Sequence, residues 1–281
     1  MPAELILGYH LIFYPDWLDF YRDDRAALKQ KFGSLEAVAS FYGGLGPDTL
    51  LEQYRADLRR AVNLGARYVV FHVSDVSLEE GYTYRWLPTN QEVIDAAVEV
   101  VNLILGEERW PFEFLVENQW WPGFTFTEPE ETARLLEGIR FAGKGILLDT
   151  GHLMNACTEL KTEAEGADYI RSMLNRHGSL AKWVRGVHLH QSLSGAYVKA
   201  HTGSLPAGLP EDYMERFGVS YQHILQIDQH RPWTDPAILP VLEQIEPRYL
   251  THELSSRGRM ARAEAVSIQT RLLRQGGRMR V

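Results

Sequence analysis

Five apolar runs in this chain each end on a side chain that can bind a metal ion, and this pattern constrains the fold more than any other feature. The runs close on His72, Glu117, Asp149, His188 and Glu253. Burying a carboxylate or an imidazole is costly unless another group compensates for it. One such residue at a strand end is ordinary, but five from segments spread over most of the sequence indicate that the strand ends converge on one charged object. A divalent cation is the simplest object of that kind.

Strand-like and helix-like segments alternate along the chain, which is typical of a parallel sheet with crossover helices. We expect strands at residues 5–10, 67–73, 112–118, 145–149, 184–190 and 248–254, and an extended segment at 224–230. Helices are expected at 16–31, 49–64, 89–105, 128–139, 167–175, 237–245 and 261–275, a long loop at 193–218, and either helix or strand at 35–42. Because no linker interrupts the pattern, we predict one domain over residues 1–281 with the α/β fold of a (β/α)8 TIM barrel. An open doubly wound sheet is the alternative.

The alternation of side chains within the expected strands favours the barrel. Successive side chains of a strand point to opposite faces. In residues 112–117 the bulky apolar side chains share one face, and Glu117 lies on the other. The same rule places His10, His72, Asp149, His188, His190 and Glu253 on the inner faces of their strands. Barrel enzymes form their active sites at the carboxyl ends of strands, which is where these residues fall.

Glu117, Asp149, His188 and Glu253 form the first candidate metal site. Three carboxylates and one imidazole suit Mn²⁺, Zn²⁺, Mg²⁺ or Co²⁺, because oxygen ligands favour the harder ions and histidine favours transition metals. Each residue taken singly could instead cap a helix or pair with an arginine. Their shared position and parity favour the metal site.

Three further residues could extend this site. His152 lies just beyond the strand that ends at Asp149, and Asp228 and His230 are two residues apart on one face of the expected extended segment. The alternative for all three is a local role in hydrogen-bonded turns. His190 is also on an inner face, where a supporting role behind the ligands is the better interpretation.

Composition restricts partners and location. The net charge of −8 disfavours a broad nucleic-acid surface, which needs a basic face. The single cysteine, Cys157, excludes an internal disulfide and favours a reducing, cytoplasmic location. We find neither a membrane-spanning apolar run nor a signal-peptide pattern. Residues 43–46, Gly-Gly-Leu-Gly, lack the spacing of a dinucleotide fingerprint, so no nucleotide cofactor is expected.

The order and spacing of these motifs resemble the xylose isomerase-like barrel superfamily, which includes ketose 3-epimerases, related sugar isomerases and endonuclease IV-type abasic-site nucleases. The residues that carry the resemblance are His72, Glu117-Asn118, Leu147 to His152, Val187 to Ser192, Asp228 to His230, and Glu253. The family usually fits more β/α units into the stretch that residues 11–66 occupy here. The resemblance therefore implies a barrel that is abbreviated or irregular in its first units.

In the sugar epimerase branch, the matching positions imply that Glu117, Asp149, His188 and Glu253 bind one divalent metal. The two glutamates would act as the catalytic acid and base, and His152 would contact the substrate oxygens. The resemblance therefore implies an isomerase or epimerase of a sugar or sugar phosphate, which transfers a proton through an enediolate.

In the nuclease branch, the same four residues hold one ion and His72 helps to hold a second. His152, Asp228 and His230 hold a third ion, and His10 is the candidate for a further histidine that this branch carries. The alternative function is therefore a multi-metal phosphodiesterase. A non-catalytic barrel that binds a ligand is a third hypothesis, although it would need no acid–base pair.

The first hypothesis implies a small, sugar-like substrate as the partner of the protein. It leaves nucleic acid as a less favoured partner and implies no membrane. A homo-oligomer stays open, because aromatic residues in the loops could serve an interface.

Overall fold

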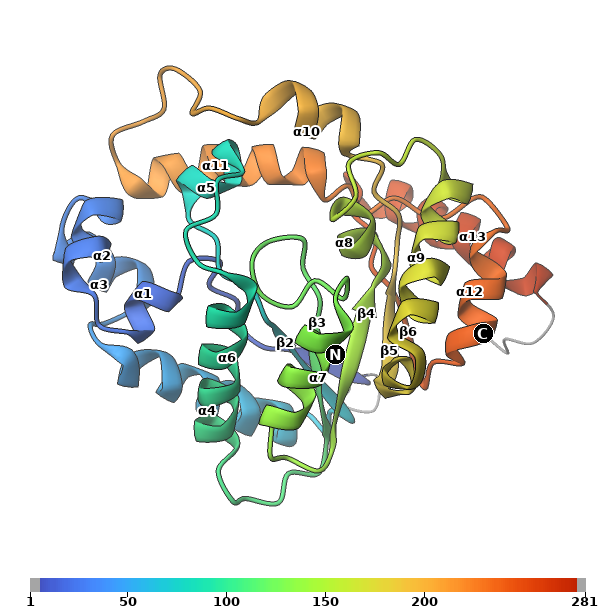
Figure 1. Cartoon of the computed structure of the whole chain (residues 1–281), viewed down its shortest axis with the longest axis horizontal. Helices are drawn as coiled ribbons and strands as arrows, with labels where there is room; N and C mark the ends of the chain where they lie inside the picture. The colour runs from blue at the N-terminus through green and yellow to red at the C-terminus, as the bar shows by residue number, and fades with distance from the viewer. Residues whose placement is uncertain (1–5, 277–281) are drawn as a thin grey trace.

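Six parallel strands curl into a half-barrel at the centre of the molecule (Figure 1). The computed structural model describes residues 6–276, so Leu5, the predicted first residue of the first strand, lies outside the described residues. The strands are β1 (Gly8–His10), β2 (Tyr68–His72), β3 (Glu113–Glu117), β4 (Lys144–Asp149), β5 (Val184–Leu189) and β6 (Tyr249–His252). They pair in sequence order, with β1 and β6 at the two edges. This arrangement confirms the predicted α/β TIM-barrel class, in an abbreviated form.

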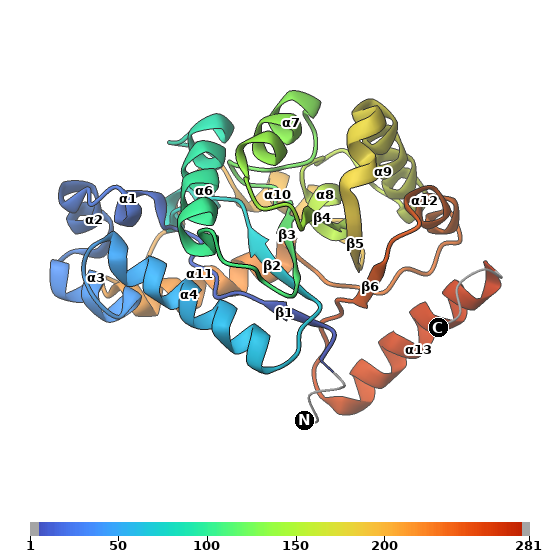
Figure 2. The same ribbon diagram turned by 90° about the horizontal axis from the view of Figure 1, so that it is seen from below.

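Helices cover the outer face of the sheet, as Figure 2 shows from below. The covering helices are α4 (Pro47–Asn63), α6 (Asn90–Leu105), α7 (Pro129–Gly138), α9 (Glu163–His177), α12 (Ile238–Ile245) and α13 (Arg259–Gln275). Capping boxes start two of them: the hydroxyl of Thr89 accepts from the amide of Glu92, and that of Thr162 accepts from the amide of Glu165. The start of α6 was predicted closely at residue 89, whereas α9 begins at Glu163, four residues before the predicted start at 167.

The two faces of the sheet pack differently, and this confirms the predicted alternation. The outward side chains join the large core under the helices; they include Val69, Phe71, Phe114, Val116, Ile146, Leu148 and Val187. The inward side chains form a separate cluster of Tyr68, Val70, Leu115, Leu147 and Tyr249. The barrel interior is therefore filled by side chains below the strand ends, and polar residues begin only at its rim.

The chain between β1 and β2 is helical throughout its regular structure, which explains the abbreviated barrel. The predicted single helix at 16–31 is instead two helices, α1 (Leu18–Tyr21) and α2 (Arg25–Phe32), and the ambiguous segment is α3 (Leu35–Tyr42). Asp24 caps α2 through its side chain, and this cap divides the predicted helix.

The expected extended segment at 224–230 is wrong for its first half. Helix α11 (Tyr213–Ile227) runs to Ile227, because Asp212 caps its start and its apolar face continues through that residue. The expected loop at 193–218 likewise contains α10 (Gly195–His201) and the first turns of α11. Asp228 and His230 therefore follow a helix rather than lie on one face of an extended segment.

Helices α5 (Leu78–Thr83), α10 and α11 lie across the carboxyl ends of the strands (Figure 1). Beneath them is a third hydrophobic cluster, made of Val76, Trp120, Trp121, Val198 and Ile227. Two short elements complete the fold: α8 (Thr150–Asn155) follows β4 directly, and a 3-10 helix (Gly178–Trp183) leads into β5. No helix among residues 6–276 is long and apolar enough to cross a membrane.

Candidate metal centre

Three sets of potential metal ligands meet at the carboxyl ends of the strands. Within each set, one candidate ligand atom per residue lies within 4.8 Å of those of the others. The sets are Glu117, Asp149, His188 and Glu253; His10, His72 and Glu117; and His152, His190, Asp228 and His230. Every residue proposed from the sequence as a ligand is thus brought into one of the three sets. Glu117 belongs to two of them.

The first set surrounds the carboxylate of Glu117, which is fully buried at the end of β3. Its Oε1 lies 3.1 Å from Nδ1 of His188, and the same nitrogen contacts a carboxylate oxygen of Glu253. Burial works against both charges, but the carboxylates of Glu117 and Glu253 raise the pKa of His188 well above its ordinary value. Burial would also raise the pKa of Glu117, yet His72 and His188 hold it well below the ordinary value. The first set therefore concentrates three carboxylates, and the imidazole of His188 lies between those of Glu117 and Glu253.

The second set occupies the other side of the same carboxylate. Oε2 of Glu117 lies 3.2 Å from Nε2 of His10 and 3.0 Å from Nε2 of His72, and these two nitrogens are 3.1 Å apart. The Nδ1 of His10 lies 2.9 Å from the carbonyl oxygen of Leu11, and this contact holds the ring with Nε2 toward Glu117. Burial lowers the pKa of His72 and keeps it neutral, the form that binds metals.

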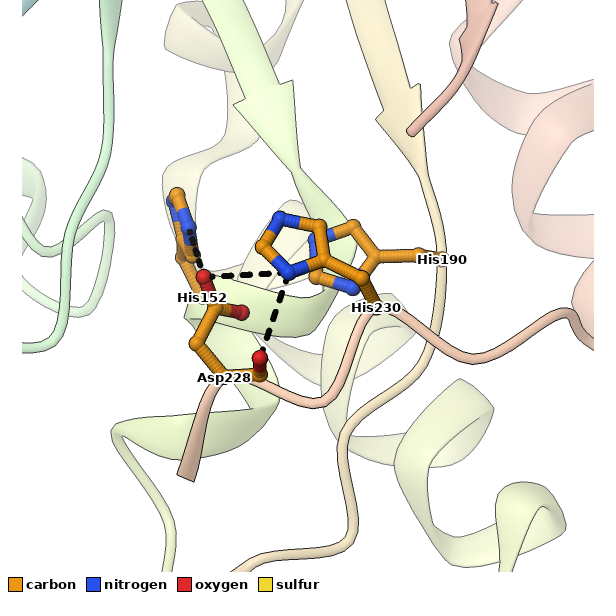
Figure 3. Close-up of side chains that lie close together, drawn as sticks. All are labelled: His152, His190, Asp228 and His230. Carbon is orange, nitrogen blue, oxygen red and sulfur yellow. Dashed lines mark hydrogen bonds and ion pairs between the residues drawn. The ribbon is translucent and has the colours of Figure 1, made fainter. Parts of the chain in front are cut away.

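The third set comes from three different elements, and its side chains converge in Figure 3. The Nε2 of His152, on α8, lies 3.3 Å from Oδ2 of Asp228, which is also 3.4 Å from Nδ1 of His230. The ring of His230 stacks on that of His190 at a centroid distance of 4.3 Å. Burial opposes protonation here, but Glu253 and Asp228 raise the pKa of His230 to about 9. Burial is likewise overcome at His152, where Asp149 and Asp228 raise the pKa well above its ordinary value.

Local sequence explains how Asp149 and its neighbours hold these positions. Asp149 ends β4 and caps α8, because its Oδ1 accepts from the amide of His152 at 2.6 Å. Its Oδ2 lies 2.9 Å from Nε2 of His190. A Cβ added to Gly151 would come within 1.9 Å of Cε1 of His190, so only glycine leaves room for this ring. The sequence Asp-Thr-Gly-His therefore ends the strand, caps the following helix and leaves room for the ring of His190.

Within residues 6–276, the four carboxylates of the centre pair only with histidines. Among the described residues, the ion-pair partners of Glu117, Asp149, Asp228 and Glu253 are His10, His72, His152, His188, His190 and His230. An arginine or lysine would have supported the alternative in which each carboxylate simply forms a structural ion pair. A cluster of carboxylates and imidazoles without such a cation has the composition of a metal site.

Unpaired buried atoms also fit bound ions. Oδ1 of Asp228, Nδ1 of His190 and Nδ1 of His72 are buried without a hydrogen-bond partner. Such atoms are costly to leave unsatisfied. His230 adds backbone strain, since its φ of +48° is unusual for a residue other than glycine. Strain and unpaired polar atoms in one place are typical of a functional site.

A cavity of about 400 Å³ opens beside the ligand sets. His72, His152, Asp228, His230 and Glu253 line it, and the remaining wall comes mainly from α5, α11 and the loop that carries Trp120 and Trp121. A second cavity of about 370 Å³ lies at the open seam between β1 and β6, where His10, His188 and Glu253 contribute to its wall. Glu253 therefore faces both cavities, whereas Glu117 lines neither.

Sequence reasoning gave His190 a supporting role, whereas the structure places it within the third set. The glycine at position 151 is a sequence signal for close packing at this point, but only the structure identifies the ring of His190 as its partner. The histidines interpreted as structural or surface residues have such contacts: His177 packs on Phe126, His223 on Tyr82 and His201 on Tyr197, while His252 contacts Gln269. The contribution of α11 to the apolar wall of the cavity was missed, because this segment was expected to be loop and extended chain.

Comparisons with known proteins agree with this architecture. A sequence model of the family described as xylose isomerase-like TIM barrel matches residues 3–248. Among solved structures, a D-tagatose 3-epimerase-like protein is similar with a TM-score of 0.52 and 16% identity, covering 98% of this chain and 82% of that one. Mannonate dehydratase from Streptococcus suis serotype2 gives a TM-score of 0.50 and 13% identity, covering 97% and 93%.

Endonuclease IV from Thermus thermophilus also matches, with a TM-score of 0.43, 16% identity and coverage of 96% of this chain and 99% of that one. No curated protein matches the sequence. At these identities the structural likenesses show the fold alone.

Proposed function

The chain belongs to the xylose isomerase-like TIM barrel family, and from that premise we propose that it is a divalent-metal-dependent enzyme with a three-ion centre that hydrolyses a phosphoester bond of a small substrate. One observation carries the proposal: both oxygens of Glu117 face candidate ligands, Oε1 toward His188 and Oε2 toward His10 and His72. A carboxylate with this surrounding is suited to be shared by two ions.

The ligand assignment follows the three sets. Glu117, Asp149, His188 and Glu253 would hold one ion. His10, His72 and Glu117 would hold the second, and His152, Asp228 and His230, with His190 beside them, the third. Divalent ions bound there would supply Lewis acidity, which lowers the pKa of water and offsets negative charge on phosphoryl oxygens.

The side chains would orient the reactants and handle protons. In hydrolysis, a water oxygen forms the new bond to phosphorus, the ester oxygen leaves, and the proton lost by water is available to the leaving alcohol. Glu253 is the carboxylate best placed to accept that proton, because it lines both cavities. Burial would raise the pKa of Glu253, but His188 and His230 hold it well below the ordinary value, so the group is ionised at neutral pH. The carbonyl oxygen of Asn118, 3.0 Å from Nδ1 of His152, fixes that ring with Nε2 toward Asp228.

A single-ion isomerase or epimerase is the second candidate, favoured by the first ligand set and by the position of Glu253 in a small cavity. That mechanism uses two glutamates as acid and base. Glu117 is less suited to this role, because it is fully buried and lines neither cavity. His152, which would contact the substrate oxygens in this mechanism, does line the cavity.

A substrate panel separates the two candidates. Purified protein loaded with Zn²⁺ or Mn²⁺ should hydrolyse aryl phosphate mono- or diesters, and a chelator should abolish the activity. An oligonucleotide with an abasic site tests the nuclease variant of the proposal in the same assay. Exchange of solvent deuterium into ketoses, with no hydrolysis of any ester, would reject the proposal in favour of the isomerase.

A further inference from the structure

Two chemically different groups of residues occupy separate parts of the wall of the cavity at the strand ends. One group consists of the candidate ligands His72, His152, Asp228, His230 and Glu253. The other is apolar and includes Phe13, Val76, Leu78, Trp120, Trp121 and Ile224. The groups adjoin where Phe13 meets the ring of His72 edge-on at 4.3 Å and where the Trp120 ring lies 5.2 Å from that of His152. A molecule in this cavity would therefore contact ligands at one end and hydrocarbon at the other.

The apolar group is not an extension of the barrel core. Val76, Trp120 and Trp121 belong to a hydrophobic cluster that is separate from the clusters on either side of the sheet, and Phe13 and Ile224 pack against it. These side chains come from the loops after β1, β2 and β3 and from α11. They form a wall above the strand ends, where a barrel enzyme meets its substrate.

The cavity wall has no permanently charged cation among the described residues that line it, since none of them is a lysine or an arginine. A chain of phosphates would need several such cations along its path. Here only the metal centre could hold an anionic group, and the rest of the substrate would meet uncharged side chains.

We propose that the substrate is amphiphilic, with one phosphoryl head at the metal centre and an uncharged aryl or alkyl group on the wall formed by Val76, Trp120, Trp121 and Ile224. The proposal rests on the function proposed above and specifies its substrate class. The volume of about 400 Å³ lies within the range of small-molecule sites and holds a head group with a ring-sized substituent.

Equilibrium binding to the Zn²⁺-loaded full-length protein tests this inference with probes that cannot be hydrolysed. Tryptophan fluorescence or calorimetry would follow phenylphosphonate, methylphosphonate and benzyl alcohol. We expect phenylphosphonate to bind at least about tenfold more tightly than methylphosphonate, because the ring buries additional apolar surface. Equal affinity of the two phosphonates would overturn the amphiphile while leaving the phosphoryl site intact. If phenylphosphonate bound no better than benzyl alcohol, the apolar wall would still bind the ring. The proposed phosphoryl site, and with it the proposed function, would be contradicted.

A matched pair of variants on α11 tests whether the preference for phenylphosphonate arises at the apolar wall. Ile224 lines the cavity, whereas Val219 is 46% exposed on the same helix. In Ile224→Gln the preference for phenylphosphonate should fall to about threefold or less, with the affinity for methylphosphonate unchanged. Val219→Gln should keep the full preference. An unchanged preference in folded Ile224→Gln would overturn this placement of the apolar group, and the comparison of probes on the unaltered protein stays decisive if that variant does not fold.

Discussion

The first and third ligand sets both bring carboxylates and imidazoles together, but different elements hold them. We call the first set strand-held and the third set loop-held. Glu117, Asp149 and His188 lie within strands whose hydrogen-bonded register fixes them side by side, with Asp149 directly opposite His188. His152 and His230, by contrast, depend on a helix cap and on a left-handed residue after α11. We therefore expect the strand-held set to tolerate changes in the surrounding loops but little change in its ligands. A loop-held set depends on its packing.

The largest effect should come from the residue that the first two sets share. Glu117→Gln removes the charge around which His10, His72 and His188 gather, so we expect the loss of two ions per chain and a fall in activity on the order of 10²–10³-fold or more. Elemental analysis and steady-state kinetics measure the two effects. Glu113→Gln, at the other end of β3, removes only a pair with Arg248 and should keep full metal content. Equal metal content in both variants would show that Glu117 is not shared by two ions.

Asp228→Asn should break the third set and leave the others intact. Its oxygen contacts only His152 and His230 among the ligands, so we expect one ion fewer per chain and a smaller loss of activity than in Glu117→Gln. Metal titration followed by elemental analysis measures the stoichiometry. Loss of all ions together would contradict the separation of the two regions.

Gly151→Ala tests the packing on which the loop-held set depends. The added methyl group would overlap the ring of His190, and overpacking of a buried site costs about 1–3 kcal/mol. Thermal unfolding of the metal-free protein reports this cost. Gly218→Ala, at a helical glycine with open space around its Cβ position, is the matched control and should unfold at the same or a slightly higher temperature, because alanine favours the helix. If both variants unfolded alike, the close approach of His190 to α8 would not limit this site.

A titration away from the ligand sets gives the background against which the loss of ions at low pH must be judged. Burial, and then the charge of Asp16, raise the pKa of Asp75 to about 8. The folded state therefore keeps a proton that the unfolded state loses, so stability falls as pH rises from about 4 to about 8, by up to about 1.4 kcal/mol per pH unit. Burial raises the pKa of Asp16 to about 6, so the window from pH 6 to 8 isolates Asp75 best.

Asp75→Asn should flatten this slope. Its side-chain oxygen can still accept from the amides of Trp17 and Leu18, each at 2.8 Å from Oδ1 in the native protein. Urea unfolding of both proteins in a chelator, at the two ends of that pH window, measures the difference. Parallel slopes would show that Asp75 does not titrate in this window.

The strand-held set was largely predictable from sequence, because parity and position are local properties. Apolar alternation alone placed Glu117, Asp149 and His188 at the inner ends of their strands, and the register brings them together. The loop-held set was only partly predictable. Asp228 and His230 were named as candidates, but the sequence did not show that α11 reaches Ile227 or that His230 adopts a positive φ. The ring packing of His190 against Gly151 depends on three-dimensional contact.

The same distinction between local signals and tertiary contacts applies to residues 11–66, which form no strand. The capping of α2 by Asp24 is a local signal, but whether residues 11–66 pair with the sheet depends on competition between strand and helix packing. The part of the apolar wall that α11 supplies could not be foreseen either, because it needs this helix to fold over the strand ends. Tertiary contacts, rather than local sequence patterns, determine whether such segments form strands or helices and where they pack.

Anomalous diffraction from crystals of the Zn²⁺-loaded protein tests the central claim most directly. We predict three peaks at the strand ends, two of them flanking the carboxylate of Glu117 and the third between His152, Asp228 and His230. A single peak among Glu117, Asp149, His188 and Glu253, at saturating Zn²⁺, would contradict the three-ion centre and leave the isomerase as the better account.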